Sequence, residues 1–97
     1  MKRDQVIRIL SERRSEIYEN FQVKSLALFG SVARDEARSD SDVDLLVEFS
    51  HPVGLFQFIG LQQYLESLLG NQVDLGTVTS LKPYLKESVM REAIHVA

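Results

Sequence analysis

The sequence contains no cysteine, and this absence excludes several chemistries at once. Disulfide bonds, zinc sites built from thiolates and cysteine nucleophiles all require that residue. Long hydrophobic runs are also missing: none approaches the roughly 20 residues that a membrane-spanning helix needs. The charged start of the chain, residues 1–5, is not followed by an apolar stretch of signal-peptide length. We therefore expect a cytoplasmic protein that does not associate with a membrane.

Positive charge is scarce relative to negative charge. The chain has 11 Lys and Arg residues against 14 Asp and Glu residues, which gives a net charge of −3. Proteins dedicated to nucleic acids usually carry a basic face, so direct nucleic-acid binding is not expected. The 97 residues, 44% of them hydrophobic and 26% charged, have the size and composition of one globular domain. We therefore expect residues 1–97 to form a single domain.

Helices and strands alternate in the hydrophobic pattern. Apolar residues at helical spacing predict helices, and short apolar or alternating runs predict strands. Ser80 is expected to cap the last helix, with Pro83 in its first turn. The other predicted elements are a helix over 2–19, a strand over 25–29, a short helix over 31–37, a strand over 43–49, a helix over 55–69 and a strand over 72–76. This order predicts an α/β or α+β domain, but the pattern alone does not determine the order of the strands.

Gly30 and Ser31 stand where a predicted strand gives way to a helix. Glycine lets the backbone approach a ligand closely, and the free N–H groups at a helix start favour a phosphate. Ser31 adds a hydroxyl donor, and Arg34 lies one turn further on. A tight turn in which Ser31 only caps the helix explains the same residues, so the pair alone is weak support for a phosphate site.

Asp42 and Asp44 share one face of a predicted strand, roughly 6–7 Å apart at Cα. Two like charges on one face repel unless something offsets them, and Mg²⁺ or Mn²⁺ does so through carboxylate oxygens. The alternative is an exposed acidic strand edge that discourages aggregation. A calcium loop is excluded. An EF-hand pattern that starts at Asp40 needs glycine at its sixth position and glutamate at its twelfth, where this chain has Leu45 and His51.

Asp74 is a third acidic residue on a predicted strand, between Val73 and Leu75. An acid among apolar neighbours is costly unless its charge is satisfied. If this strand lies beside strand 43–49, Asp74 can join Asp42 and Asp44 on one face. Three carboxylates near a phosphate-binding turn are the arrangement that two-metal phosphoryl chemistry needs.

The combination of these residues resembles the motif of the polymerase-beta-like nucleotidyltransferase superfamily. Gly30-Ser31 is followed after ten residues by Asp42-x-Asp44, and Asp74 comes later in a strand. The layout of essentially the whole chain, up to residues 91–94, looks like that of the smallest members, the minimal nucleotidyltransferases. This resemblance implies the fold of that superfamily, a small mixed sheet of three or four strands flanked by helices.

The resemblance also implies how a nucleotide would be held. Gly30 and Ser31 would bind the triphosphate of a nucleoside triphosphate such as ATP. Arg34 matches a basic position that is common after the Gly-Ser turn. Asp35 departs from the family, which often has glycine there; this acid can alter the turn and adds negative charge near the phosphates.

For the three acids, the resemblance implies a metal site and a catalytic role. Asp42 and Asp44 would bind two metal ions, expected to be Mg²⁺, with Mn²⁺ as an alternative. Asp74 would complete the metal site and help to deprotonate the incoming hydroxyl group.

Many proteins of this family resemble antitoxins that are paired with a helical HEPN-domain ribonuclease toxin. The implied activity is transfer of AMP from ATP to a tyrosine hydroxyl of that toxin, within a hetero-oligomer. One alternative is a catalytically silent antitoxin that neutralises its partner by binding; another is transfer to a small molecule, for which the chain looks too short. Phe56, Tyr64 and Tyr84 are aromatic residues that a partner interface could use, although core or scattered surface positions explain them equally well.

Overall fold

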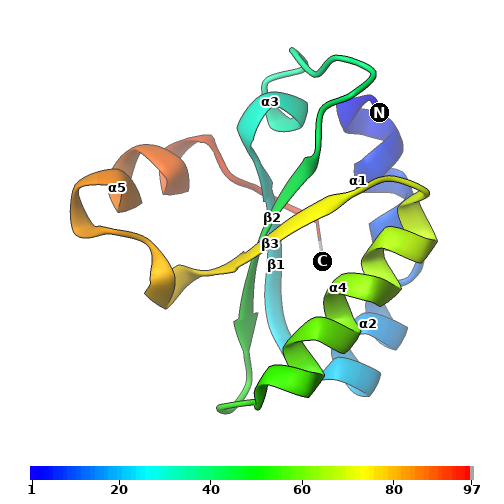
Figure 1. The fold of residues 1–97 in the computed structure, drawn as a ribbon, viewed down its shortest axis with the longest axis vertical. Helices are drawn as coiled ribbons and strands as arrows, with labels where there is room; N and C mark the ends of the chain where they lie inside the picture. Colours follow the sequence, from blue (N-terminus) through cyan, green and yellow to red (C-terminus); the bar gives the residue numbers. More distant parts are fainter. Residues whose placement is uncertain (97) are drawn as a thin grey trace.

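The computed structural model of the protein describes residues 1–96 and contains a mixed four-stranded sheet (Figure 1). The strands lie in the order β3-β2-β1-β4, with β2 and β3 parallel and the other neighbouring pairs antiparallel. Their bounds are β1 Val23–Phe29, β2 Val43–Phe49, β3 Val73–Thr77 and β4 Ile94–His95. The predicted α/β class and the small mixed sheet are confirmed.

One face of the sheet is covered by three helices. These are α1 (Arg3–Glu12), α2 (Arg14–Phe21) and α4 (Leu55–Leu69), which lie together on the right of Figure 1. α4 buries Leu61, Leu65 and Leu69 against this face, and Gly70 ends the helix in the left-handed conformation at φ 66°. The strands supply the other side of the core through alternate apolar residues.

The first helical region is interrupted, so the predicted continuous helix over 2–19 is wrong in one respect. α1 ends at Glu12, Arg13 takes a non-helical conformation with φ −107° and ψ 15°, and α2 begins at Arg14. Val6 and Leu10 of α1 and Ile17 of α2 are fully buried. No glycine or proline stands at the break, so the sequence contains no local signal for it.

The short helix after β1 is also shorter than predicted. α3 spans Gly30–Ala33 rather than 31–37, because Asp35 follows it in the left-handed region at φ 59°. The N–H of Asp35 donates to the carbonyl of Val32, and the N–H of Glu36 donates to the carbonyl of Ser31. These two bonds form a Schellman motif, which satisfies the last carbonyls of the helix and stops it.

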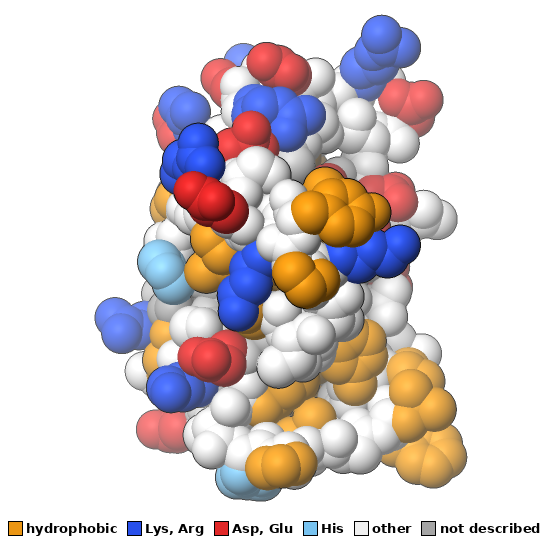
Figure 2. Space-filling model, turned by 90° about the vertical axis from the view of Figure 1, so that its left-hand side faces the viewer, with side chains coloured by type: hydrophobic (Ala, Val, Ile, Leu, Met, Phe, Trp, Pro, Cys, Tyr) orange, Lys and Arg blue, Asp and Glu red, His pale blue; other side chains and the backbone are white. Residues whose placement is uncertain are grey.

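The last helix, α5 (Pro83–Glu92), has Pro83 in its first turn as predicted, but it begins at that residue, and Lys82 rather than Ser80 occupies the cap position. Ser80 ends a separate 3-10 turn, η1 (Val78–Ser80), in which its hydroxyl and that of Thr77 cap each other's backbone. None of the residues of α5 is buried. Figure 2 looks onto this side of the molecule, where acidic and basic side chains mingle over the upper part and hydrophobic ones gather mainly in the lower right.

The remaining bounds agree closely with the prediction. β2 and α4 match it at both ends, β1 begins two residues earlier than expected and β3 is shifted by one residue. The fourth strand, β4, was not predicted; its two residues pair with Ala27 and Leu28 of β1. Within residues 1–96, no helix has the length and apolar character needed to cross a membrane.

Candidate functional site

Asp44 and Asp74 lie directly opposite each other on the two parallel strands β2 and β3. Because side chains alternate along a strand, residues in register share a face. Val43 of β2 and Val73 of β3, the aligned pair just before them, point into the core and are buried. The two carboxylates therefore stand side by side on the opposite face, Asp44 half-buried and Asp74 exposed.

The surroundings of Asp44 disfavour the charged form of its carboxyl group. Burial raises the pKa of Asp44 above its ordinary value, and the negative charges of Asp74 and Asp42 raise this pKa further. A hydrogen bond with the Asp74 carboxyl group acts in the same direction, whereas the positive charge of Arg34 lowers the pKa. The negative charges of Asp42 and Asp74 thus both act on Asp44.

Gly30 brings the start of α3 against the Asp44 carboxylate. Its backbone lies in the left-handed region at φ 73°, which side chains rarely adopt. A Cβ atom at residue 30 would collide with the Oδ2 atom of Asp44. Phe29, the residue before it, is the β1 partner of Asp44 in the sheet. Residue 30 must therefore be glycine both for its conformation and for the space beside the acid.

Ser31 does not cap the helix, so the simpler explanation of this residue is wrong. Phe29 occupies the cap position of α3 and makes no side-chain capping bond. Within residues 1–96, no hydrogen bond of the Ser31 hydroxyl is found, and the residue is half-buried. The hydroxyl is thus available to a ligand next to Gly30.

Arg34 is close to the acids but is held by other partners. Its guanidinium group donates to Glu36 at 3.3 Å and to Glu92, at the end of α5, also at 3.3 Å. Its positive charge still reaches Asp44, as the direction of its effect on the Asp44 pKa shows. The predicted phosphate contact of Arg34 therefore requires that it share or leave these two carboxylates.

The donor set of this site suits a hard divalent cation. Carboxylate oxygens are the ligands that Mg²⁺ and Mn²⁺ prefer, and a cation would offset the repulsion that raises the pKa of Asp44. In the part of the chain that the structure describes, no three His, Asp or Glu side chains are yet gathered closely enough to hold a metal ion. The structure thus brings Asp44 and Asp74 together, while the three-ligand site with Asp42 stays a prediction.

The sequence analysis did not predict two features of the structure. One is the pairing of Arg34 with Glu92, which depends on where the end of α5 lies in space. The other is a cavity of about 690 Å³ at the opposite end of β2 and β3, with Glu48 and Lys86 in its wall. No local pattern signals either feature, because each joins residues that are far apart in the chain.

Of the three aromatic residues considered for an interface, two have side chains that are exposed to solvent. The side chains of Phe56 and Tyr84 are largely exposed. Tyr64 is not, because its ring packs on Phe21 at 4.9 Å between centroids and its hydroxyl donates to Glu16 at 2.8 Å. Tyr64 thus serves the contact between α4 and α2.

Comparison with known proteins identifies the family. The model of the nucleotidyltransferase domain family matches residues 5–96. Protein adenylyltransferase MntA of Thermococcus cleftensis is 43% identical over 93 residues, which are 96% of this chain and 94% of that protein. A solved structure of a candidate minimal nucleotidyltransferase is 40% identical, with a TM-score of 0.81 over 97% of this chain and 95% of that one.

Two more distant structures share the fold. A toxin–antitoxin structure with AMP-PNP is 24% identical, with a TM-score of 0.71 over 100% of this chain and 73% of that one. A complex of a tri-AMPylated Shewanella oneidensis HEPN toxin with an MNT antitoxin is 19% identical, with a TM-score of 0.66 over 94% and 71% of the two chains. The family match, the relative in Thermococcus and the register of Asp44 with Asp74 agree, and the chain belongs to the nucleotidyltransferase domain family as one of its minimal members.

Proposed function

We propose that this protein transfers AMP from ATP to a hydroxyl group, expected to be that of a tyrosine, on a partner HEPN-domain toxin, and so acts as an antitoxin. The observation that carries the proposal is the aligned pair Asp44 and Asp74 with Gly30 packed against it. The similarity to a protein adenylyltransferase over almost the whole chain supports the choice of AMP and of a protein acceptor. The HEPN partner is suggested by the more distant MNT antitoxin complex.

In the transfer step, the acceptor oxygen forms a bond to the α-phosphorus of ATP. The bond between that phosphorus and the oxygen bridging to the β-phosphate breaks, and pyrophosphate leaves. Asp74 is suited to receive the hydroxyl proton, because its exposed carboxylate faces the open side of the sheet. Gly30 and Ser31 would hold the leaving phosphates, with Arg34 contributing positive charge once it turns from Glu92.

Asp42, Asp44 and Asp74 would hold Mg²⁺. Bound there, Mg²⁺ would neutralise the triphosphate and make the acceptor hydroxyl easier to deprotonate. The raised pKa of Asp44 fits this role, since the cost of gathering negative charge is removed when a cation binds.

A second function, neutralisation by binding alone, is favoured by one observation. Arg34 is already engaged by Glu36 and Glu92, so the positive charge nearest the acids is partly cancelled. A protein in which this arrangement persists would cover its partner without modifying it.

One experiment separates the two functions. The protein is purified together with its native partner, incubated with ATP and Mg²⁺, and both chains are weighed intact. We expect the partner to gain one or more AMP units, and Asp42→Asn and Asp44→Asn to abolish the gain while Asp40→Asn, an exposed loop acid, leaves it intact. An intact complex without mass gain under any of the four nucleoside triphosphates would contradict transfer and establish the binding function.

A further inference from the structure

α5 is packed more loosely against the rest of the protein than the other α-helices. Each of α1, α2, α3 and α4 buries at least one side chain, whereas none of the 10 residues of α5 is buried. An isolated helix of this length is only marginally stable in water, so it depends on tertiary contacts. A helix with few buried contacts also opens more easily than the core. The contacts that keep α5 in place are therefore worth identifying one by one.

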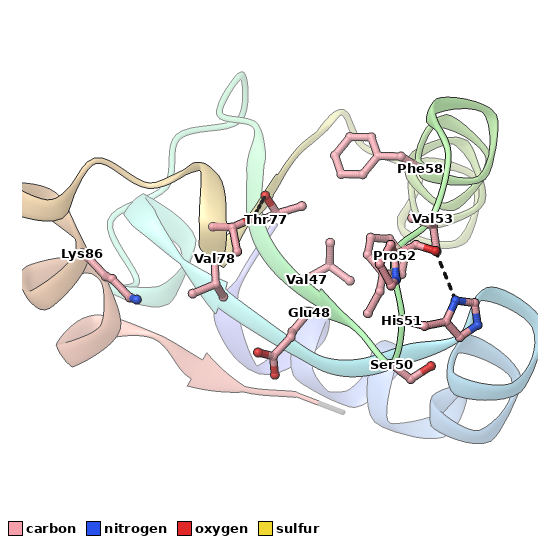
Figure 3. A pocket seen from close by; sticks show the side chains of 12 residues that line it. Val47, Glu48, Ser50, His51, Pro52, Val53, Phe58, Thr77, Val78 and Lys86 are labelled. Atoms are coloured by element: carbon pink, nitrogen blue, oxygen red, sulfur yellow. Dashed lines mark hydrogen bonds between the residues drawn. The ribbon is translucent and has the colours of Figure 1, made fainter.

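The first half of α5 contributes little to this packing. The side chains of Tyr84 and Leu85 are exposed. Lys86, in the next position, borders the cavity of about 690 Å³ at the far end of β2 and β3, together with Glu48 and Val78 (Figure 3). This part of the helix thus lies beside open space, and its attachment to the protein must come mainly from elsewhere.

The last residue of α5 forms an ion pair with the candidate nucleotide site. Nη1 of Arg34 donates to the Glu92 carboxylate at 3.3 Å, across 58 positions of the sequence. This bond joins the end of α5 to the residue that follows α3, and the two helices are in contact. About half of each side chain is exposed, 44% for Arg34 and 50% for Glu92, so a ligand can reach the pair from solvent.

A triphosphate and Glu92 would compete for the same guanidinium group. Arg34 is close enough to Asp44 to lower the pKa of that residue, and it follows Gly30 and Ser31 by one helical turn. Phosphate oxygens and carboxylates bind a guanidinium group in the same way, and both carry negative charge. Glu92 therefore opposes a bound triphosphate twice, by occupying Arg34 and by its own charge.

The other partner of Arg34 does not involve α5. Glu36 accepts from Nε of Arg34 at 3.3 Å and lies only two positions further along the chain. This pair can persist whatever the position of α5, because both residues belong to the same short segment. Of the two ion pairs of Arg34, only the one with Glu92 links the nucleotide site to α5.

We propose that the ion pair of Arg34 with Glu92 is an autoinhibitory latch. Without nucleotide it keeps α5 docked at α3 and keeps Arg34 from the phosphate site; a bound triphosphate takes Arg34, breaks the pair and releases α5. The inference rests on the proposed function in one respect, since it takes the triphosphate to lie at Gly30 and Ser31. It makes the docking of α5 depend on whether the site is occupied.

The first test measures how Glu92 affects the affinity for nucleotide. Binding of a non-hydrolysable ATP analogue with Mg²⁺ is measured by calorimetry for the wild type, Glu92→Gln and Glu87→Gln. We expect Glu92→Gln to bind about two- to fivefold more tightly, because an exposed ion pair of this strength no longer has to be broken. Glu87→Gln is the matched control and should keep the wild-type affinity, since Glu87 also lies on α5 but pairs at 2.9 Å with Arg91 of the same helix.

The second test follows α5 directly by hydrogen–deuterium exchange, which reports the opening of backbone hydrogen bonds. In the wild type, the analogue with Mg²⁺ should speed exchange of the α5 amides several-fold and leave those of α4 unchanged. In Glu92→Gln, the α5 amides should exchange rapidly even without nucleotide, and the analogue should add little. A purely structural role of Glu92 predicts no dependence on the analogue in the wild type.

Two kinds of result would overturn the inference. Weaker binding by Glu92→Gln would mean that Glu92 positions Arg34 for the phosphates, and unchanged binding would mean that the pair does not compete with them. Exchange of α5 that the analogue slows or leaves unchanged in the wild type would rule out the release. The two proposals fail separately: unchanged affinity in Glu92→Gln with normal AMP transfer removes only the latch, whereas tighter binding in Glu92→Gln without any transfer to the partner removes only the proposed function.

Discussion

The two faces of the sheet receive different kinds of side chain from the same strand, β2. Toward α1, α2 and α4, β2 directs Val43, Leu45 and Val47, each fully buried. Toward the opposite face it directs Asp44, half-buried, Leu46, buried, and Glu48, exposed. Because side chains alternate, seven residues supply both the centre of the core and the acid of the site. The comparison teaches that the covered face stabilises the fold, and that the open face retains a charge that opposes folding.

The largest effect is expected on the covered face. Leu45→Ala removes a fully buried side chain and should lower the free energy of unfolding by about 2–5 kcal/mol. Urea denaturation measures this loss, and Glu48→Ala on the open face of the same strand should change it by less than about 0.5 kcal/mol. Similar losses at the two positions would erase the difference between the faces.

Replacing the central acid of the open face should stabilise the protein. Burial, then the charges of Asp74 and Asp42, raise the pKa of Asp44 in the folded state. The neutral form therefore contributes stability that is complete below the unfolded-state pKa of about 3.9 and is lost as pH rises through the folded-state pKa. Asp44→Asn, which cannot ionise, should thus exceed the wild type in stability at pH 7 without divalent cations, and by more than at pH 4.

Urea midpoints at the two pH values, in the presence of a chelator, measure this difference. Asp40→Asn, on the exposed loop before β2, is the control and should show no comparable gain. A variant Asp44→Asn that is less stable than the wild type at pH 7 would mean that the acid has a favourable partner in the folded state.

A smaller gain in stability is expected from a substitution at the end of α3, beside the open face. Asp35 occupies the left-handed position of the Schellman motif, where glycine carries no steric penalty. Asp35→Gly should raise the free energy of unfolding by up to about 1 kcal/mol, and Asp35→Val should lower it. Thermal unfolding of both variants checks the order, and a gain with valine would show that the backbone changes conformation.

The smallest change in the free energy of unfolding is expected in α4, at a residue that packs against neither face of the sheet. Phe56 is 91% exposed, so Phe56→Ser should change the free energy of unfolding by less than about 0.5 kcal/mol. Leu65→Ala, on the buried side of the same helix, should cost about 2–5 kcal/mol. A large loss at Phe56 in the isolated protein would show that this end of the helix packs against something in solution, such as a second copy.

Elements with strong local signals could be predicted from the sequence. β2 was predicted to the residue because apolar and polar side chains alternate along it, and α4 because Gly54 and Gly70 stand at its two ends. The break at Arg13 and the early end of α3 at Asp35 were missed, since neither position has a glycine or proline. β4 was missed because two residues form a strand only through their pairing with β1.

The candidate site was predictable for a similar reason. Gly30, Ser31, Asp42, Asp44 and Asp74 have a spacing that can be read directly along the chain. That Asp74 faces Asp44 depended on strand order, which the pattern left open and the structure supplied. The partners of Arg34 and the cavity at the far end of β2 and β3 depend on contacts between distant segments, which no local pattern reports.

The central claim is that the open face binds a divalent cation together with a nucleotide, and the thermal unfolding midpoint tests it most directly. Mg²⁺ with a non-hydrolysable ATP analogue should raise the midpoint of the wild type by several degrees, because a ligand that binds only the folded state stabilises it. Asp44→Asn and Asp74→Asn should lose this rise, and Asp40→Asn should keep it. An equal rise in the wild type and in Asp44→Asn would contradict the claim.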